Sequence, residues 1–211
     1  MDDPGTDRAP APKVSGGAIL LYWIPLGAGA DVVRRSGRLF ERLSARVQGR
    51  SVCDLYHFAL EVTVGPDRFT IEMAPIPARA DSDRGVVCEG PVGTRWLGWL
   101  RVFRYEVRCW KDGTIPDARA ATNGPFLVDG DSHVAEQLIG LTPSVPAPVW
   151  GRDELEAGEM WNSNSVTSWL LASAGVDVGR LRPPSGGRAP GWDAGITVAR
   201  RTHLAAATTS V

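Results

Sequence analysis

Hydrophobic residues along this chain gather in runs whose internal spacing predicts the secondary structure. Residues 18–24 form a continuous apolar run of strand length, typical of a buried strand. The segments 56–64 and 69–74 alternate apolar and polar residues around a Gly-Pro-Asp turn, which predicts a β-hairpin. The segment 96–110 is rich in aromatic and β-branched residues and is predicted to be a further strand.

Other segments show the spacing of amphipathic helices. Residues 31–47 can form one apolar and one arginine-rich face, although Gly37 weakens this helix. Residues 132–141 follow a capping Asp131 or Ser132 and place apolar side chains inward. Near the C-terminus, 196–199 reads as a short strand.

The clearest helix begins in a polar tetrapeptide. Residues 162–165 are Asn-Ser-Asn-Ser, and apolar residues follow at helical spacing until Gly175 supplies a C-terminal stop. The free backbone N–H groups and the positive end of the helix dipole make such a start suited to stabilising an anion. Ser163 and Ser165 are the candidate nucleophiles of this motif, since it contains no cysteine. The alternative interpretation is a well-capped core helix.

The order of elements predicts an α+β fold with an antiparallel sheet packed against helices. We expect one domain over residues 16–200, preceded by a disordered tail at 1–15 that is rich in Pro, Ala and Asp. Residues 201–211 are expected to form a loose C-terminal tail. The polar stretch 81–93 reads as a connection between strands.

Composition excludes several classes of function. The chain has 211 residues and a net charge of -1, which argues against a nucleic-acid binder that works through bulk positive charge. The three cysteines lack metal-ligand spacing and read as reduced, which favours a cytoplasmic location. No apolar run is long enough to span a membrane. We expect no metal and no cofactor.

The predicted hairpin gathers titratable side chains on one face. If Val64 pairs with Phe69, Glu61 lies opposite Glu72, and His57 shares their face. The opposite face is apolar and belongs to a core; it carries Phe58, Leu60, Val62, Phe69, Ile71 and Met73. His57 is either a structural histidine or a general base oriented by Glu72 or Glu61.

Two motifs carry a resemblance to a known family. The strand 56–62, which contains His57, and the later Trp161-Asn162-Ser163-Asn164-Ser165 occur in the order seen in the circularly permuted papain-like superfamily. That group includes lecithin retinol acyltransferase-like proteins and permuted desumoylating-type peptidases, and it is related to NlpC-type amidases. The sequence resembles a bacterial member over about residues 18–200. The nucleophilic cysteine of the family falls on Ser163 here.

The resemblance implies a hydrolase or acyltransferase that acts on an amide, ester or thioester of a small molecule or peptide. Ser163 would be the nucleophile, His57 the base and Glu72 the orienting acid. The Asn162 side chain and the backbone near Asn164 would form the oxyanion hole. Further substrate contacts would come from Glu61, Trp161 and Trp192.

The rival interpretation is a non-catalytic module on the same scaffold. Here the exchange of cysteine for Ser163 marks lost chemistry, and Trp150, Trp161 and Trp192 line a groove for a ligand or a protein partner. Geometry distinguishes the two interpretations. A Ser163 hydroxyl that points away from His57, or a cleft filled by tryptophan, favours the module.

Overall fold

The computed structural model describes residues 16–26, 41, 45–46, 49, 51–77, 84–115, 117–184 and 186–209. Its strands form one antiparallel sheet in the order β4-β5-β3-β2-β1-β6. The strands are β1 (Gly17–Pro25), β2 (Tyr56–Val64), β3 (Asp67–Pro75), β4 (Val86–Pro91), β5 (Arg104–Lys111) and β6 (Pro125–Asp129). The α-helices of the described residues are α2 (Ser132–Leu141), α3 (Ser163–Ser173) and α4 (Trp192–Thr209). The predicted α+β class with an antiparallel sheet is confirmed.

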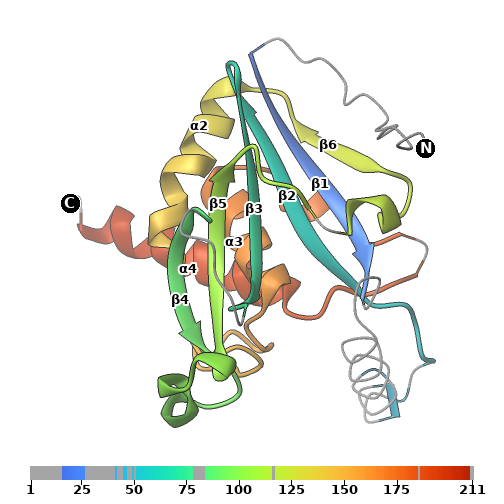
Figure 1. The fold of residues 1–211 in the computed structure, drawn as a ribbon, viewed down its shortest axis with the longest axis vertical. Coiled ribbons are helices and arrows are strands. Elements are labelled where there is room, and N and C mark those ends of the chain that lie inside the picture. The colour runs from blue at the N-terminus through green and yellow to red at the C-terminus, as the bar shows by residue number, and fades with distance from the viewer. Residues whose placement is uncertain are drawn as a thin grey trace, which may run out of the picture.

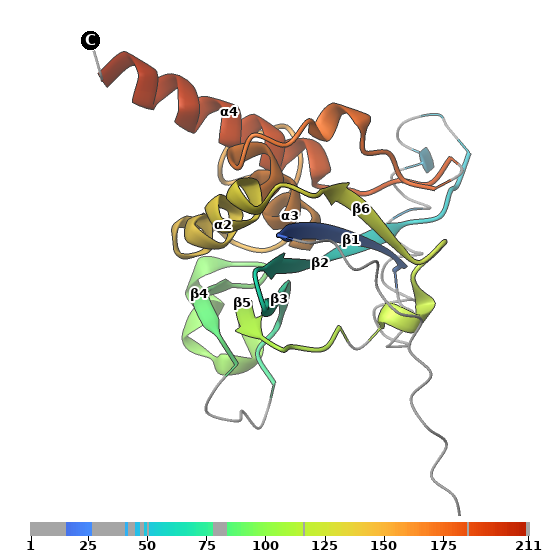
Figure 2. The same cartoon turned by 90° about the horizontal axis from the view of Figure 1, so that it is seen from above.

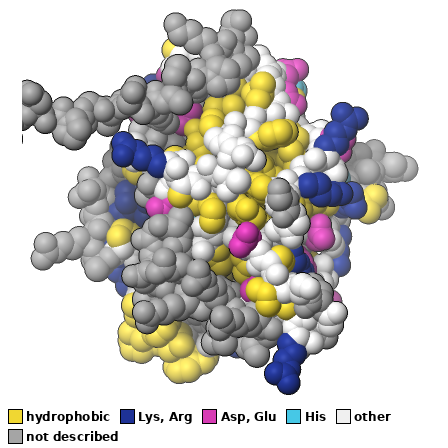
Figure 3. Space-filling model, turned by 90° about the vertical axis from the view of Figure 1, so that its right-hand side faces the viewer, with side chains coloured by type: hydrophobic (Ala, Val, Ile, Leu, Met, Phe, Trp, Pro, Cys, Tyr) yellow, Lys and Arg dark blue, Asp and Glu magenta, His cyan; other side chains and the backbone are white. Residues whose placement is uncertain are grey.

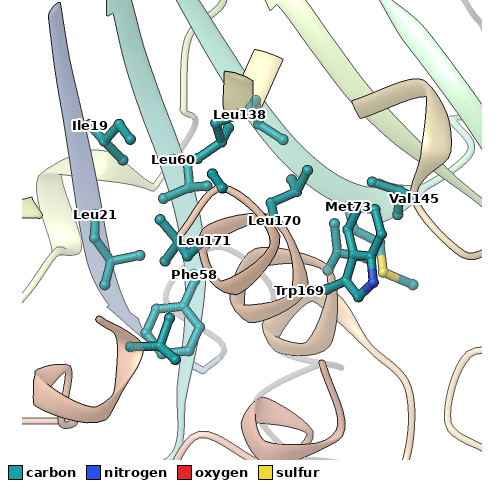
Figure 4. Packing of buried hydrophobic residues seen from close by; sticks show 14 of the residues in the cluster. Ile19, Leu21, Phe58, Leu60, Met73, Leu138, Val145, Trp169, Leu170 and Leu171 are labelled. Atoms are coloured by element: carbon teal, nitrogen blue, oxygen red, sulfur yellow. The ribbon is translucent and has the colours of Figure 1, made fainter. Parts of the chain in front are cut away.

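The helices lie on one side of the sheet. Figure 1 shows α3 behind β2 and β3, and Figure 2 shows all three helices on the same side of β1 and β2. The main core fills the space between these layers. Figure 4 shows Leu170 and Leu171 of α3 directed at the sheet, where Phe58 and Leu60 of β2 lie. The apolar face of β2 is therefore the face that α3 covers.

The other face of the sheet carries a smaller apolar cluster next to β1. Leu20, Tyr22 and Ile24 of β1 pack there with Ala59 and Ile115. Alternate residues of β1, such as Ile19 and Leu21, belong to the main core instead. Both faces of β1 are thus buried, which explains why its sequence is continuously apolar rather than alternating.

The β2–β3 hairpin forms with a different register from the expected one. Val64 pairs with Asp67, and Glu61 pairs with Thr70 instead of Glu72. The turn is shorter than expected because Gly65 adopts a positive φ of 55°, which glycine tolerates without strain. The shift is two residues, an even number, so the expected division into an apolar and a polar face is retained.

Several expected boundaries are corrected. Residues 96–103 form the 3-10 turns η1 (Arg95–Trp99) and η2 (Arg101–Phe103), and β5 begins only at Arg104. Strand β4 lies within the stretch 81–93, which was expected to be a connection. The prediction for 196–199 was wrong, because these residues belong to α4, which also includes 201–209 of the expected loose tail.

The close packing of α3 against α4 explains the last correction. A Cβ atom on Gly195 would lie 2.1 Å from the Ser165 carbonyl oxygen, so glycine lets the two helices approach closely. Ala194 and Ala199 of α4 are fully buried. The expected helix at 31–47 lies mostly outside the described residues, and the expected tail at 1–15 lies entirely outside them.

Candidate functional site

The polar motif at 162–165 starts α3, as predicted. Asn162 is the N-cap, and its side-chain oxygen accepts hydrogen bonds from the backbone N–H groups of Asn164 at 2.9 Å and Ser165 at 3.3 Å. The Ser165 hydroxyl oxygen in turn accepts from the Asn162 N–H at 3.1 Å. This reciprocal arrangement is a capping box, and it satisfies backbone donors that would otherwise lack partners.

The same side chains attach α3 to two other elements. Asn164 is buried, and its Nδ2 donates to the Tyr56 carbonyl at the start of β2 and to the Pro190 carbonyl. The Ser165 hydroxyl donates to the Gly191 carbonyl at 2.7 Å. A Cβ on Gly191 would lie within 2.7 Å of atoms of Asn162 and Ser165. These contacts join α3, β2 and the turn before α4.

Ser163 stands apart from this network. It is the first residue of α3 and is half-buried, while its neighbours Asn164 and Ser165 are buried. Within the described part of the chain, its hydroxyl makes no hydrogen bond to another side chain or carbonyl. Of the two candidate nucleophiles, Ser165 is therefore committed to structure, and Ser163 is the accessible one.

His57 lies on the opposite face of the sheet from α3. Phe58 and Leu60 point into the main core with α3, so the alternation of β2 directs His57 and Ala59 to the other face. The register with β1 is regular through the pair of Ile24 and His57, so no bulge reverses this direction. The structure therefore does not bring His57 and Ser163 together, because the sheet separates the imidazole from the start of α3.

The electrostatic partner of His57 is also different from the expected one. Burial lowers the pKa of His57 from its ordinary value of 6.5, and the nearby Asp117 carboxylate offsets part of this effect. Asp117 immediately precedes the η3 turn (Ala118–Ala120), which lies against β1 on the smaller apolar cluster. A lowered pKa keeps the imidazole neutral near pH 7.

The two glutamates of the polar face are engaged by arginines. Glu72 forms an ion pair with Arg108 at 2.9 Å, and Glu61 forms one with Arg68 at 3.1 Å. Burial raises the pKa of Glu72, although the charge and hydrogen bond of Arg108 act in the other direction. Glu72 thus lies in an ion pair with Arg108, while the carboxylate that acts on the His57 imidazole is that of Asp117.

A further carboxylate belongs to this charged face. Glu106 of β5 is fully buried and forms ion pairs with Arg84 and Arg108. Burial alone would raise the pKa of Glu106, but the hydrogen bonds and charges of the two arginines outweigh it and lower the pKa. The carboxylates of the polar face thus form ion pairs with arginines, rather than an acid–base pair with His57.

The two tryptophans expected to contact substrate belong to the core. Trp161 and Trp192 are 2% and 8% exposed. The Trp192 ring packs on Phe58 with ring centroids 4.6 Å apart and lies 6.4 Å from Trp23. Trp150 is half-buried and packs edge-on against Tyr105. These rings pack in the main core or against it, so they do not line an open groove together among the described residues.

A pocket of about 240 Å³ lies elsewhere, beside β6. It is lined by residues of β1, the 122–126 turn and the segment around η5 (Val178–Arg180), including Trp23, Phe126, Arg180 and Arg182. None of the residues predicted to be catalytic lines it. Within the described ranges, no three His, Cys, Asp or Glu side chains gather in a way that could hold a metal ion.

Among the described residues, the most exposed aromatic side chains lie in a loop that the sequence pattern assigned to a strand. We define the aromatic loop as residues 95–103, which connect β4 to β5. Trp96 and Trp99 are 71% and 76% exposed. Gly98 is the sequence feature that could have indicated a loop here, because a glycine inside a strand pattern marks a bend or a close backbone approach.

Comparisons of the chain with protein-family models, curated proteins and solved structures find no match. No helix of the described residues is long and apolar enough to cross a membrane. The cysteines Cys53, Cys88 and Cys109 are all free thiols.

Proposed function

We propose that this chain is a non-catalytic binding module, built on a scaffold of the circularly permuted papain-like kind. The observation that carries the proposal is the placement of His57 on the sheet face opposite α3. A serine hydroxyl must lose its proton to a nearby base during nucleophilic attack. The hydrolase interpretation assigns His57 to Ser163 as this base, and the two residues lie on opposite faces of the sheet.

The hydrogen bonds around α3 support the same proposal. The Asn162 side-chain oxygen is occupied by the helix cap, and its Nδ2 donates to the Pro190 carbonyl at 2.8 Å. The amide that the hydrolase interpretation placed in the oxyanion hole thus has structural partners. The dipole of α3 would favour an anion near Ser163, but a helix dipole does not supply a general base.

The partner-binding surface in this proposal is the aromatic loop. Its tryptophans are exposed, whereas Trp161 and Trp192 are buried. Exposed aromatic side chains are enriched where proteins contact partners, because they bury a large area for little loss of conformational freedom. The free thiols of the described chain are compatible with a cytoplasmic location, which belongs to the same proposal.

A fluorophosphonate probe tests the absence of catalysis. The full chain, Ser163→Ala and His57→Ala are incubated with the probe and read by intact mass, beside an authentic serine hydrolase as positive control. We expect no mass addition to any form of this protein. A mass addition that both substitutions abolish would establish an activated serine and overturn the proposal.

A further inference from the structure

The aromatic loop exposes apolar side chains to an unusual degree. Trp96, Trp99 and Val102 are 71%, 76% and 77% exposed, and Phe103 is 36% exposed. The loop projects at the lower end of the molecule in Figure 1, beyond the ends of β4 and β5. In Figure 3, hydrophobic side chains gather at this same lower end. Contiguous apolar surface of this kind marks an interaction site in a folded protein.

The structure holds the loop in this exposed conformation. Trp96 and Trp99 stand one 3-10 turn apart in η1, so they share a face, while Leu97 between them is half-buried. A Cβ on Gly98 would lie 2.7 Å from the Pro91 Cβ, so η1 packs closely on the end of β4.

Polar contacts fix both ends of the loop. Arg95 donates two hydrogen bonds to the Glu154 carboxylate, at 2.7 and 2.9 Å. Arg104 donates to the Gly98 carbonyl at 3.0 Å and forms an ion pair with Glu89. The outward direction of the two indoles is therefore part of the folded structure and does not reflect a loose segment.

The charge of the loop is one-sided. Residues 95–103 contain Arg95 and Arg101 and no aspartate or glutamate. Arg95 is paired with Glu154, whereas Arg101 is exposed and has no carboxylate partner among the described residues. The surface thus combines two indoles with an unneutralised guanidinium, a combination that suits an apolar layer bordered by negative charge.

We propose that the aromatic loop docks on the headgroup region of an anionic lipid bilayer. Trp96 and Trp99 would insert beside the headgroups, where an indole can bury its apolar body and keep its N–H hydrated. Arg101 would contact lipid phosphates or carboxylates. This inference rests on the proposed function, since it names the partner of the binding module.

The shape of the loop favours a bilayer over a folded protein partner. The loop projects at one end of the molecule (Figure 1), and the pocket lined by Trp23 and Phe126 lies elsewhere, beside β6. A projecting apolar tip requires a partner that is concave or that deforms around it. Lipid headgroups deform at little cost, and the charge of Arg101 matches an anionic headgroup.

Vesicle co-sedimentation tests the inference with the full chain. The probe is a set of phosphatidylcholine vesicles with and without phosphatidylserine. We expect binding that increases with phosphatidylserine content and decreases with added salt. Trp96→Ala combined with Trp99→Ala should weaken binding at least about tenfold. Arg101→Glu should weaken binding to the anionic vesicles about fivefold or more.

Matched substitutions separate the loop from general effects. Phe126→Ala removes an exposed aromatic ring from β6, at the other edge of the sheet, and Arg200→Glu makes the same charge change on exposed α4 surface. Neither should alter vesicle binding. Circular dichroism should show that the loop variants keep the fold, because Trp96 and Trp99 are mostly exposed.

The outcomes are distinguishable from those of the probe-labelling experiment. Absent vesicle binding, or binding that survives loss of both tryptophans, overturns the lipid partner and leaves the non-catalytic module standing. Sedimentation velocity is run beside it, to detect self-association that depends on Trp96 and Trp99 without vesicle binding. That result would assign the loop to a second copy of this chain and would also overturn the lipid partner. Labelling of Ser163 would overturn the proposed function alone.

Discussion

Replacing Asn162 with alanine removes the N-cap side chain of α3. In the folded protein this amide caps the helix through the N–H groups of Asn164 and Ser165 and donates from Nδ2 to the Pro190 carbonyl. Loss of an asparagine cap costs about 1 kcal/mol. Loss of the hydrogen bond to Pro190 costs about 1 kcal/mol more. The carbonyl of Pro190 keeps a donor, since Asn164 also bonds to it.

We therefore expect Asn162→Ala to lower the free energy of unfolding by about 2 kcal/mol. For a chain of this size, this corresponds to a decrease in Tm of about 4–8 °C. Thermal unfolding followed by circular dichroism measures the decrease, and urea unfolding gives the free energy independently.

Ser163→Ala is the matched control one residue away. Ser163 is half-buried at the first helical position and is outside the capping box. Its replacement should change the free energy of unfolding by less than about 0.5 kcal/mol. Equal losses of Tm in the two variants, or an unchanged Tm in Asn162→Ala, would refute the reasoning that the motif serves to build α3.

Three further substitutions or conditions test other parts of the structure. Because burial lowers the pKa of His57, the unfolded chain binds more protons than the folded chain between the ordinary value of 6.5 and the lowered pKa. Acidification through this range should therefore destabilise the wild type more than His57→Gln, and equal pH dependence in urea unfolding contradicts this. Burial raises the pKa of Cys88 from 9.0 to about 11. Iodoacetamide at pH 8 should therefore alkylate native Cys88 about a hundredfold more slowly than the unfolded chain, as followed by peptide mass spectrometry, and equal rates would argue against burial. Gly195→Ala should destabilise the protein, because its Cβ would collide with the Ser165 carbonyl, whereas Gly140→Ala meets open space in α2 and should stabilise it by about 0.5–1 kcal/mol. The reverse order in thermal unfolding would show that α3 and α4 do not pack this closely.

Local interactions made part of the fold predictable. The cap of α3 depends on residues three positions apart, Asn162 and Ser165, and the structure contains the capping box that this spacing permits. Alternation along 56–64 and 69–74 identified the two faces of the hairpin correctly. The register differed because it depends on the turn at Gly65, which the alternation alone does not determine.

Tertiary packing decided what the local pattern missed. The β-branched residues near Ile196 favour a strand. The segment is nevertheless part of α4, which packs against α3 through the buried Ala194 and Ala199 and the close approach at Gly195. Strand β6 is short and half exposed, so it carries little sequence signal of its own.

The placement of His57 was implied by the sequence pattern itself. An apolar helix covers the apolar face of a sheet, and that face of β2 carries Phe58 and Leu60. His57 lies on the polar face, so α3 and His57 had to lie on opposite sides. The pairing of His57 with Ser163 was inferred from the resemblance of two short motifs to a known family. That inference disagrees with the packing of an apolar helix on the apolar face of the sheet.

The most direct test of the account is the position of the His57 ring, measured by nuclear Overhauser contacts in the isotopically labelled protein. Ile24 lies directly opposite His57 on β1 and shares its face. The account predicts contacts between the His57 ring protons and the Ile24 methyl groups, with none to Ser163. Contacts between the ring and the Ser163 β protons would contradict it and restore the case for a catalytic pair.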